Sequence, residues 1–174
     1  MIKPLLKQLS TENWRIKCQI IEILKSCVSQ PGCLTENSMK VFFGLVDDRI
    51  DAVRLKANEL LADIISGQPK DWVDQNVMPK LAGAKENANY LKRQNMLCII
   101  EKTSSNVSEK TFKEVYQNIV ASYLNDKVPN VRVKTMQVLK ANSKLNSPAA
   151  ERTIEKLKED KDVEVREALK RLRA

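Results

Sequence analysis

The side chains of this sequence that could do chemistry are four cysteines and two adjacent pairs of carboxylates, because the chain contains no histidine. Without histidine it cannot by itself supply a Ser-His-Asp or Cys-His nucleophile, a 2-His-1-carboxylate iron site or most catalytic zinc sites. The four glycines are isolated, so the sequence has no glycine-rich phosphate-binding loop. We therefore predict that the chain is not an enzyme and that it requires no cofactor or metal ion.

The cysteines show no C-x-x-C spacing and lie mainly among apolar positions of helical period; they are Cys18, Cys27, Cys33 and Cys98. We interpret them as buried or free thiols of a reducing compartment rather than as a disulfide scaffold. No secretory signal and no apolar run of about 18 residues is visible. We expect a soluble protein of the cytoplasm, or of the cytoplasm and nucleus, without a membrane partner.

The two carboxylate pairs, Asp47-Asp48 and Glu159-Asp160, could be imagined as an acid and a base. Both pairs stand at the start of a predicted helix, where N-terminal capping and the helix dipole explain acidic residues without catalysis. We interpret them as structural.

A pattern of three positions recurs five times along the chain and indicates the elements that carry these residues. Cations spaced by 37, 39, 39 and 34 residues define it, and they are Lys17, Arg54, Arg93, Arg132 and Arg166. Six residues before each cation stands a polar residue that can cap a helix, namely Thr11, Asp48, Asn87, Asp126 and Asp160. Twelve residues before it stands an apolar one: Leu5, Phe42, Leu81, Val120 and Ile154. The period is typical of α-helical solenoid repeats.

Each repeat therefore predicts a first helix, a short turn and a second helix with the cation in its first turn. Apolar residues follow the cations at helical spacing, for example Ile20, Ile21 and Leu24. We predict an all-α fold, an α-α superhelix of about five HEAT-type helical hairpins, in which stacking buries the apolar stripes. The array is expected to span residues 1–174, with repeats near 1–30, 34–67, 71–104, 109–145 and 147–174.

The net charge of +8 comes from 30 Lys and Arg residues interleaved with 22 Asp and Glu residues. Because no block of like charge and few aromatic residues are present, a solvated surface is favoured over nucleic-acid binding. Some cations nevertheless fall in the turns between the two helices of a repeat and would form a positive ridge; they are Arg15, Arg49, Lys92, Lys127 and Lys161. Such a ridge could follow an acidic protein or a nucleic acid.

Two aromatic residues stand three positions before a cation and are predicted to lie in these same turns. They are Trp14, which neighbours Arg15, and Tyr90. Trp, Tyr and Arg are enriched at binding hot spots, so both positions are candidate contacts, although either aromatic ring could instead pack on its own repeat. Trp72 opens a predicted first helix and is assigned to the core.

The sequence resembles a known family at several segments. The segments are Asn13-Trp14-Arg15-Ile16-Lys17, Trp72 with Val77-Met78-Pro79-Lys80, Asn89-Tyr90-Leu91-Lys92-Arg93 and Val128-Pro129-Asn130-Val131-Arg132. In order and spacing they are similar to the last five HEAT repeats of the protein phosphatase 2A scaffold (A) subunit family. In that family the carboxy-terminal repeats hold the phosphatase catalytic subunit through the turns within each repeat.

The resemblance implies a set of contacts to a Ser/Thr protein phosphatase catalytic subunit. Trp14 and Arg15 would anchor it from the first turn, Tyr90 and Arg93 from the third, and Val128 from the fourth, while Ile50 is the matching apolar residue of the second turn. Two features depart from the family: Asp51 stands where an aromatic residue is usual, and this chain is basic whereas the family is generally acidic.

The leading hypothesis is thus a non-catalytic scaffold, a phosphatase regulator that binds a catalytic subunit along its turns. A second hypothesis is a module similar to tubulin-binding TOG arrays, which docks on tubulin or another acidic protein surface. Weak nucleic-acid binding along the basic ridge is a third. The chain could also be a fragment of a longer solenoid, whose first layer stacks on further repeats or on a second copy.

Overall fold

The computed structural model describes residues 2–30, 32–84 and 87–174, and these residues form helices and the turns that connect them. Their contacts divide the chain into two compact units, Met1–Gln68 and Pro69–Ala174, called unit 1 and unit 2 below. No helix in the described part of the chain is long and apolar enough to span a bilayer. That one continuous array runs through both units stays a prediction.

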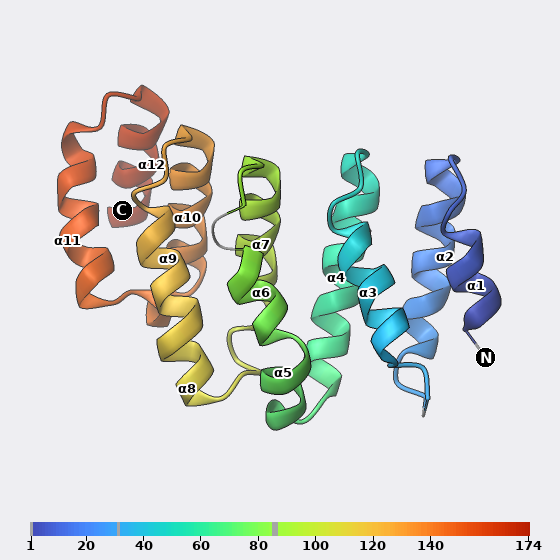
Figure 1. The fold of residues 1–174 in the computed structure, drawn as a ribbon. Helices are drawn as coiled ribbons and strands as arrows, with labels where there is room; N and C mark the ends of the chain where they lie inside the picture. Colours follow the sequence, from blue (N-terminus) through green and yellow to red (C-terminus); the bar gives the residue numbers. More distant parts are fainter. Residues whose placement is uncertain (1, 31, 85–86) are drawn as a thin grey trace. The chain divides into compact units, whose positions relative to one another are not determined.

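Unit 1 contains two antiparallel helix pairs (Figure 1). The first pair is α1 (Lys3–Gln8) and α2 (Trp14–Cys27), and the second is α3 (Glu36–Leu45) and α4 (Asp51–Gly67). Helix α1 packs on α2, α3 packs on α4, and the longer helices α2 and α4 pack on each other. The second helices therefore join one pair to the next.

The core of unit 1 consists of the apolar positions that recur at helical spacing. Ile21 and Leu24 of α2, Phe42 of α3 and Leu60 and Leu61 of α4 are all completely buried. Burying such a side chain contributes about 1.5–3 kcal/mol. The predicted core positions of α2, α3 and α4 are confirmed, whereas the predicted apolar position of α1, Leu5, is only half-buried.

Unit 2 contains three further helix pairs, and their first helices are interrupted. The first helices are α5 (Lys70–Asn76) with α6 (Met78–Ala84), then α8 (Glu109–Thr111) with a π-helical segment η1 (Phe112–Gln117) and α9 (Asn118–Tyr123), then α11 (Pro148–Lys156) with a 3-10 turn η3 (Leu157–Glu159). The second helices are continuous: α7 (Tyr90–Thr103), α10 (Pro129–Ala141) and α12 (Val163–Arg173), and a second 3-10 turn, η2 (Ser143–Leu145), follows α10.

Proline explains the first of these interruptions. Pro79 has no N–H to donate to the preceding turn, so α5 ends at Asn76 and the chain restarts as α6. Within unit 2, α10 packs on both α7 and α12, and α9 packs on α11. The arrangement repeats that of unit 1, with the uninterrupted second helices in contact along a row.

The π-helical segment is held by a buried hydrogen bond to the preceding repeat. Tyr116 of η1 is completely buried, and its hydroxyl lies 2.6 Å from Thr103 Oγ1 on α7. Burial raises the pKa of this phenol well above its usual value.

Trp72 was assigned to the core from the sequence, but the structure leaves it half-buried on α5, so that assignment is corrected.

The residues that cap the second helices differ from those predicted from the sequence. The side chains that cap second helices are Asn13, Asn89 and Asp162, which stand two residues after the predicted capping positions. Asp48, one of the predicted caps, instead accepts a hydrogen bond from the N–H of Ile50 within the turn. A short polar side chain that bonds an N–H two residues on stabilises a turn rather than a helix start.

Candidate protein-binding surface

The residues singled out by the sequence lie at the turns between the first and second helix of each pair and at the first turn of the second helix. We call these stretches the turn ridge of unit 1 (residues 10–16 and 46–52) and the turn ridge of unit 2 (residues 87–92, 125–130 and 158–164). The recurring cations hold these turns in place by bonding their side-chain and backbone oxygens.

Three of the recurring cations join their repeat to the following turn in the described part of the chain. In unit 1, Lys17 Nζ lies 2.7 Å from Asp48 Oδ2 on the following turn. In unit 2, Arg93 donates from Nε and Nη2 to the two carboxylate oxygens of Asp126 at 2.6 and 2.8 Å. Arg132 repeats the arrangement with a single bond from Nη2 to Asp160 Oδ1 at 2.8 Å.

The four recurring arginines each bond a backbone oxygen in the turn of their own repeat. Arg54 donates to the backbone oxygen of Asp48 at 2.8 Å, Arg132 to that of Asp126 at 2.6 Å and Arg166 to that of Asp160 at 2.5 Å. The acceptor stands six residues before the donor in every case, and this bond explains the constant spacing of six residues between the polar residue and the cation in the sequence. Lysine, with one ammonium group, makes only the bond to the next turn in the first repeat.

Two of the turn carboxylates are held in the ionised form. Burial would raise the pKa of Asp48, but hydrogen bonds from Lys17 and from the N–H of Ile50 outweigh it and lower the pKa below its usual value. Burial would also raise the pKa of Asp160, but hydrogen bonds from the N–H of Asp162 and from the guanidinium of Arg132 outweigh it, so this pKa is lowered as well. Both carboxylates are therefore negatively charged at neutral pH and stay matched to their cations.

Arg93 is consequently part of a joint between repeats. It is only 5% exposed, and its donors are taken by Asp126 and by the backbone oxygens of Asn87 and Ala88. The resemblance placed Arg93 among the partner contacts, but a guanidinium that is already buried and bonded cannot present itself to a partner. We therefore remove Arg93 from the contact set.

Trp14 and Arg15 form a compact exposed pair on the turn ridge of unit 1. Asn13 caps α2 by accepting bonds from the N–H groups of Arg15 and Ile16. Trp14 is the first residue of the helix and is 36% exposed, and the Arg15 guanidinium lies 4.6 Å from the centre of its ring. Ile16 beside them is 42% exposed. An apolar ring next to a cation and an aliphatic side chain resembles the composition of a binding hot spot.

The second turn of unit 1 is more polar. Ile50 is half-buried at the residue before α4 and its side chain makes no capping bond. Asp51 forms an ion pair with Arg54 at 2.8 Å, and Arg49 forms an exposed pair with Glu12 of the first turn at 2.6 Å. Exposed pairs contribute about 0–1 kcal/mol, so the Arg49–Glu12 pair links the two turns only weakly.

The turn ridge of unit 2 carries large side chains with apolar surface, two of them exposed and one half-buried. Tyr90 begins α7 and is 38% exposed, and Val128 stands half-buried before α10. Val163 begins α12 and is 57% exposed, yet sequence reasoning missed it. It stands three residues before its cation, as Trp14 and Tyr90 do, so the register of the repeats could have identified it.

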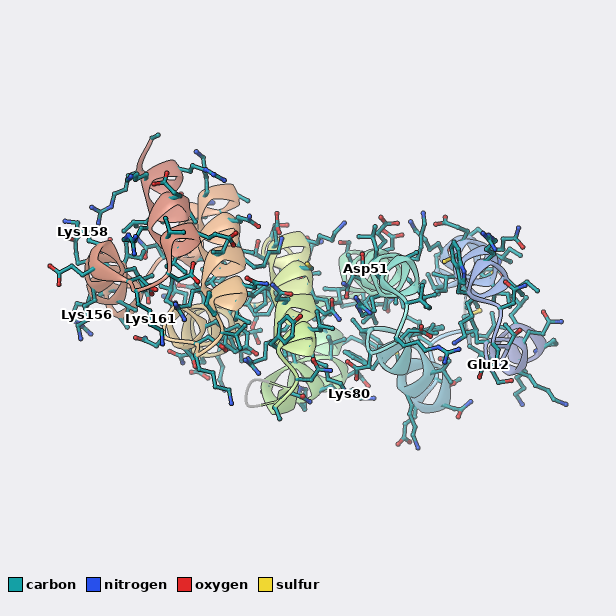
Figure 2. The ribbon with its side chains drawn as sticks, turned by 90° about the horizontal axis from the view of Figure 1, so that it is seen from above. Glu12, Asp51, Lys80, Lys156, Lys158 and Lys161 are labelled. Carbon is teal, nitrogen blue, oxygen red and sulfur yellow. The ribbon has the colours of Figure 1, made fainter. Side chains whose placement is uncertain are left out.

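The charge that the ridges present is more positive than the turn sequences suggest. In Asp126-Lys127 and Asp160-Lys161 the acid is buried in an ion pair, whereas the lysine that follows is exposed. Figure 2 labels Lys156, Lys158 and Lys161 at the last helix pair of unit 2. Unit 2 has 21 Lys and Arg residues against 14 Asp and Glu residues, whereas unit 1 has nine against eight.

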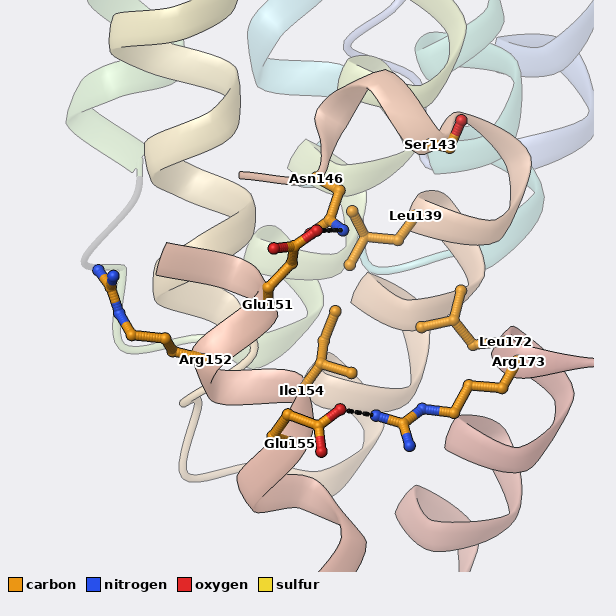
Figure 3. A pocket seen from close by; sticks show the side chains of 9 residues that line it. All are labelled: Leu139, Ser143, Asn146, Glu151, Arg152, Ile154, Glu155, Leu172 and Arg173. Atoms are coloured by element: carbon orange, nitrogen blue, oxygen red, sulfur yellow. Dashed lines mark hydrogen bonds and ion pairs between the residues drawn. The ribbon is translucent and has the colours of Figure 1, made fainter. Parts of the chain in front are cut away.

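A cavity of about 560 Å³ lies between α10, α11 and α12 at the last helix pair (Figure 3). Leu139, Ile154 and Leu172 give it apolar walls. Its two carboxylates are occupied, because Glu151 accepts a bond from Asn146 at 3.2 Å and Glu155 is paired with Arg173. The lining thus offers no set of groups arranged for catalysis.

The chemistry-bearing residues of the sequence remain dispersed. No group of three or more Cys, Asp and Glu side chains that could hold a metal ion occurs among the described residues. Burial raises the pKa of the Cys18 and Cys98 thiols, which keeps them protonated at neutral pH and weakly nucleophilic. The four cysteines are all free in the structure.

Comparisons with known proteins agree on the fold. No protein-family model matches the chain, and no curated protein matches its sequence. A designed armadillo repeat protein in complex with the peptide (KR)4 superposes with a TM-score of 0.52 at 15% identity, over 97% of this chain and 79% of that one. An engineered protein from the Northeast Structural Genomics Consortium matches with a TM-score of 0.50 at 16% identity, over 97% and 76%. The predicted fold class, an all-α protein with an α-α superhelix, is confirmed, and the matched structures include a designed armadillo repeat protein.

Proposed function

We propose that this chain is a non-catalytic scaffold that binds a protein partner through its turn ridges. The observation that carries the proposal is the exposed Trp14–Arg15 pair, set at the start of α2 by the Asn13 cap. In such a pair the tryptophan buries much area with few rotatable bonds and the arginine offers hydrogen-bond donors. The function of the chain is then to position a partner, without chemistry of its own.

The fold supports a binding role in general. A repeat array has an extended surface on which each repeat contributes a similar turn. The matched designed armadillo repeat protein is described in complex with a peptide, so a solenoid of this class can serve as a binding surface. In this chain the second helices pack in a row within each unit and the buried ion pairs fix the turns, which leaves the ridge side chains preorganised.

We propose a Ser/Thr protein phosphatase catalytic subunit as the partner, because the segments around Trp14, Tyr90 and Val128 resemble those of the phosphatase 2A scaffold family. The contact set comprises Trp14, Arg15 and Ile50 on unit 1 and Tyr90 and Val128 on unit 2, each of which lies on a turn ridge. A cytoplasmic location, alone or with the nucleus, is part of the same proposal.

Affinity capture from a cell extract tests the proposal. Wild-type protein and a Trp14→Ala/Arg15→Glu variant are immobilised, and bound proteins are identified by mass spectrometry. Losing this anchor is expected to cost about 2 kcal/mol or more of binding free energy, so capture of the catalytic subunit should fall at least tenfold. Lys3→Glu/Lys7→Ala, two exposed changes on α1 away from the ridge, is the control. Equal capture by wild type and the Trp14/Arg15 variant would reject this anchor.

An acidic protein surface, of which tubulin is one example, is the second candidate partner. The exposed lysines of the unit 2 ridge favour it, since their neighbouring carboxylates are already paired with arginine. Purified tubulin in a co-sedimentation assay tests this candidate. Pelleting that depends on Lys127 and Lys161 would support it over the phosphatase.

A further inference from the structure

We propose that a groove on unit 2, between the α9–α10 turn and the turn before α12, binds a short acidic segment of a protein partner. The inference rests on the proposed function, because the groove is part of the turn ridge of unit 2. It adds the chemistry of the bound segment, namely carboxylate side chains facing two lysines.

The groove is an open cavity of about 440 Å³. Its floor includes Leu124 and Leu157, which are both buried. Its sides are the two turns, with Lys127 on one and Lys161 on the other, and both lysines are exposed. This volume lies in the range of sites that hold a few side chains of a ligand.

The charge around the groove is unbalanced in favour of an anion. Asp126 and Asp160 also line it, but each carboxylate is already neutralised, by Arg93 and by Arg132 respectively. Lys127 and Lys161 form no ion pair within the described residues, so their charges remain available. An acidic side chain placed between the two turns would meet two ammonium groups and no free carboxylate.

The two arginine–aspartate pairs next to the groove differ in their hydrogen bonds. Arg93 bonds Asp126 through two nitrogens, whereas the equivalent Arg132 bonds Asp160 through Nη2 alone. The Nε of Arg132 is buried and has no hydrogen-bond partner in the described part of the chain. The Arg132–Asp160 pair is therefore less completely hydrogen-bonded than the Arg93–Asp126 pair, and the unpaired charges at the groove are those of Lys127 and Lys161.

The same features favour an acidic peptide over a nucleic acid. Single-stranded nucleic acids bind proteins through a cationic groove together with aromatic side chains that stack on the bases. No aromatic residue lines this groove, whose floor is aliphatic instead. An aliphatic floor between two cations suits a segment in which acidic residues flank an apolar one.

Fluorescence anisotropy on the full chain tests the inference directly. The probe is a labelled peptide of four Asp-Glu repeats with one central leucine, and a labelled peptide of four Lys-Arg repeats is the comparison. We expect the acidic probe to bind and the basic one not to bind. Lys127→Glu/Lys161→Glu should weaken the acidic probe by on the order of tenfold or more, because two attractive charges become repulsive.

Matched variants separate the groove from overall charge. Lys102→Glu/Lys110→Glu makes the same change in net charge at exposed residues outside the turn ridge, and it should leave the affinity nearly unchanged. Lys127→Arg/Lys161→Arg keeps the charge and should retain binding. Circular dichroism establishes that each variant is folded.

Several outcomes would overturn the inference. These are no binding of the acidic probe, equal weakening by the two charge-reversal pairs, or tighter Lys127- and Lys161-dependent binding of a labelled oligothymidine than of the peptide. Failure of the proposed function gives a different result. Phosphatase capture would be absent or insensitive to Trp14→Ala/Arg15→Glu, while the acidic probe would still bind in a manner that requires Lys127 and Lys161.

Discussion

At the scale of single residues, the structure shows that the recurring cations form hydrogen bonds and ion pairs with the turns, which the sequence alone did not indicate. The sequence predicted that a cation stands at a fixed place in each repeat, and that a polar residue precedes it by six positions. It could not show that the carboxylate partner of Arg93 is Asp126, because that contact joins residues 33 apart in sequence. The polar residue was also misassigned as a helix cap, since the same short side chains stabilise both turns and helix starts.

Removing one member of a buried pair should be costly. Arg93→Met leaves the Asp126 carboxylate buried without its guanidinium and is expected to lower the free energy of unfolding by about 3 kcal/mol or more. Lys17→Met removes a more exposed cation and should cost less, about 1 kcal/mol. Urea titrations followed by circular dichroism measure both. Equal losses for the two variants would contradict the role given to the buried joint.

Because the pKa values of Asp48 and Asp160 are lowered in the folded state, the free energy of unfolding should depend on pH in the acidic range. Their stabilisation is fully present above the pKa of an unfolded aspartate, about 3.9, and is lost as the pH falls through the lower folded pKa. The free energy of unfolding should therefore decrease from about pH 5 downwards. In Asp48→Asn/Asp160→Asn this decrease should be shallower, because neither side chain takes up a proton. Urea titrations across this pH range give the two slopes, and parallel slopes would refute the assignment.

At the scale of elements, hydrophobic period predicted the continuous second helices well and the interrupted first helices poorly. The stripe that contains Ile20, Ile21 and Leu24 is buried as expected. The π-helical segment at Phe112–Gln117 was not predicted; within it only Tyr116 is buried, and Phe112 and Val115 are half-buried. Trp14 and Tyr90 were predicted within turns, and each proves to be the first residue of a second helix.

Two glycines of unit 1 should respond to alanine with opposite signs. Gly32, in the connection between α2 and α3, has a φ of +79°, which a Cβ disfavours, so Gly32→Ala should destabilise by about 1 kcal/mol. Gly44 lies within α3 and a Cβ there would meet no atom within 4 Å. Gly44→Ala should stabilise by about 0.5–1 kcal/mol, because alanine is the better helix former. Thermal unfolding of both variants measures the effect, and a shift in the same direction for both would be inconsistent with the structure.

At the scale of the whole molecule, the fold could be predicted because each repeat needs similar residue types at the same positions, so the sequence has a regular period. The partner could not, because the repeat register gives the position of an exposed side chain such as Trp14, Tyr90 or Val163 but not the protein that binds it. The charge distribution adds information at this scale: almost all of the net charge of +8 belongs to unit 2, where it amounts to +7. The two units therefore offer different chemistry, an aromatic anchor on unit 1 and a lysine-rich ridge on unit 2.

The measurement that tests the central claim most directly is hydrogen–deuterium exchange of the full chain, alone and with purified phosphatase catalytic subunit. The account predicts slower exchange in the complex at the turn ridges, above all at residues 11–18, 87–92 and 125–130. The opposite turns, residues 104–108 and 142–147, should exchange at the same rate in both samples. Protection confined to those opposite turns, or no protection anywhere, would contradict the proposal that the ridges bind this partner.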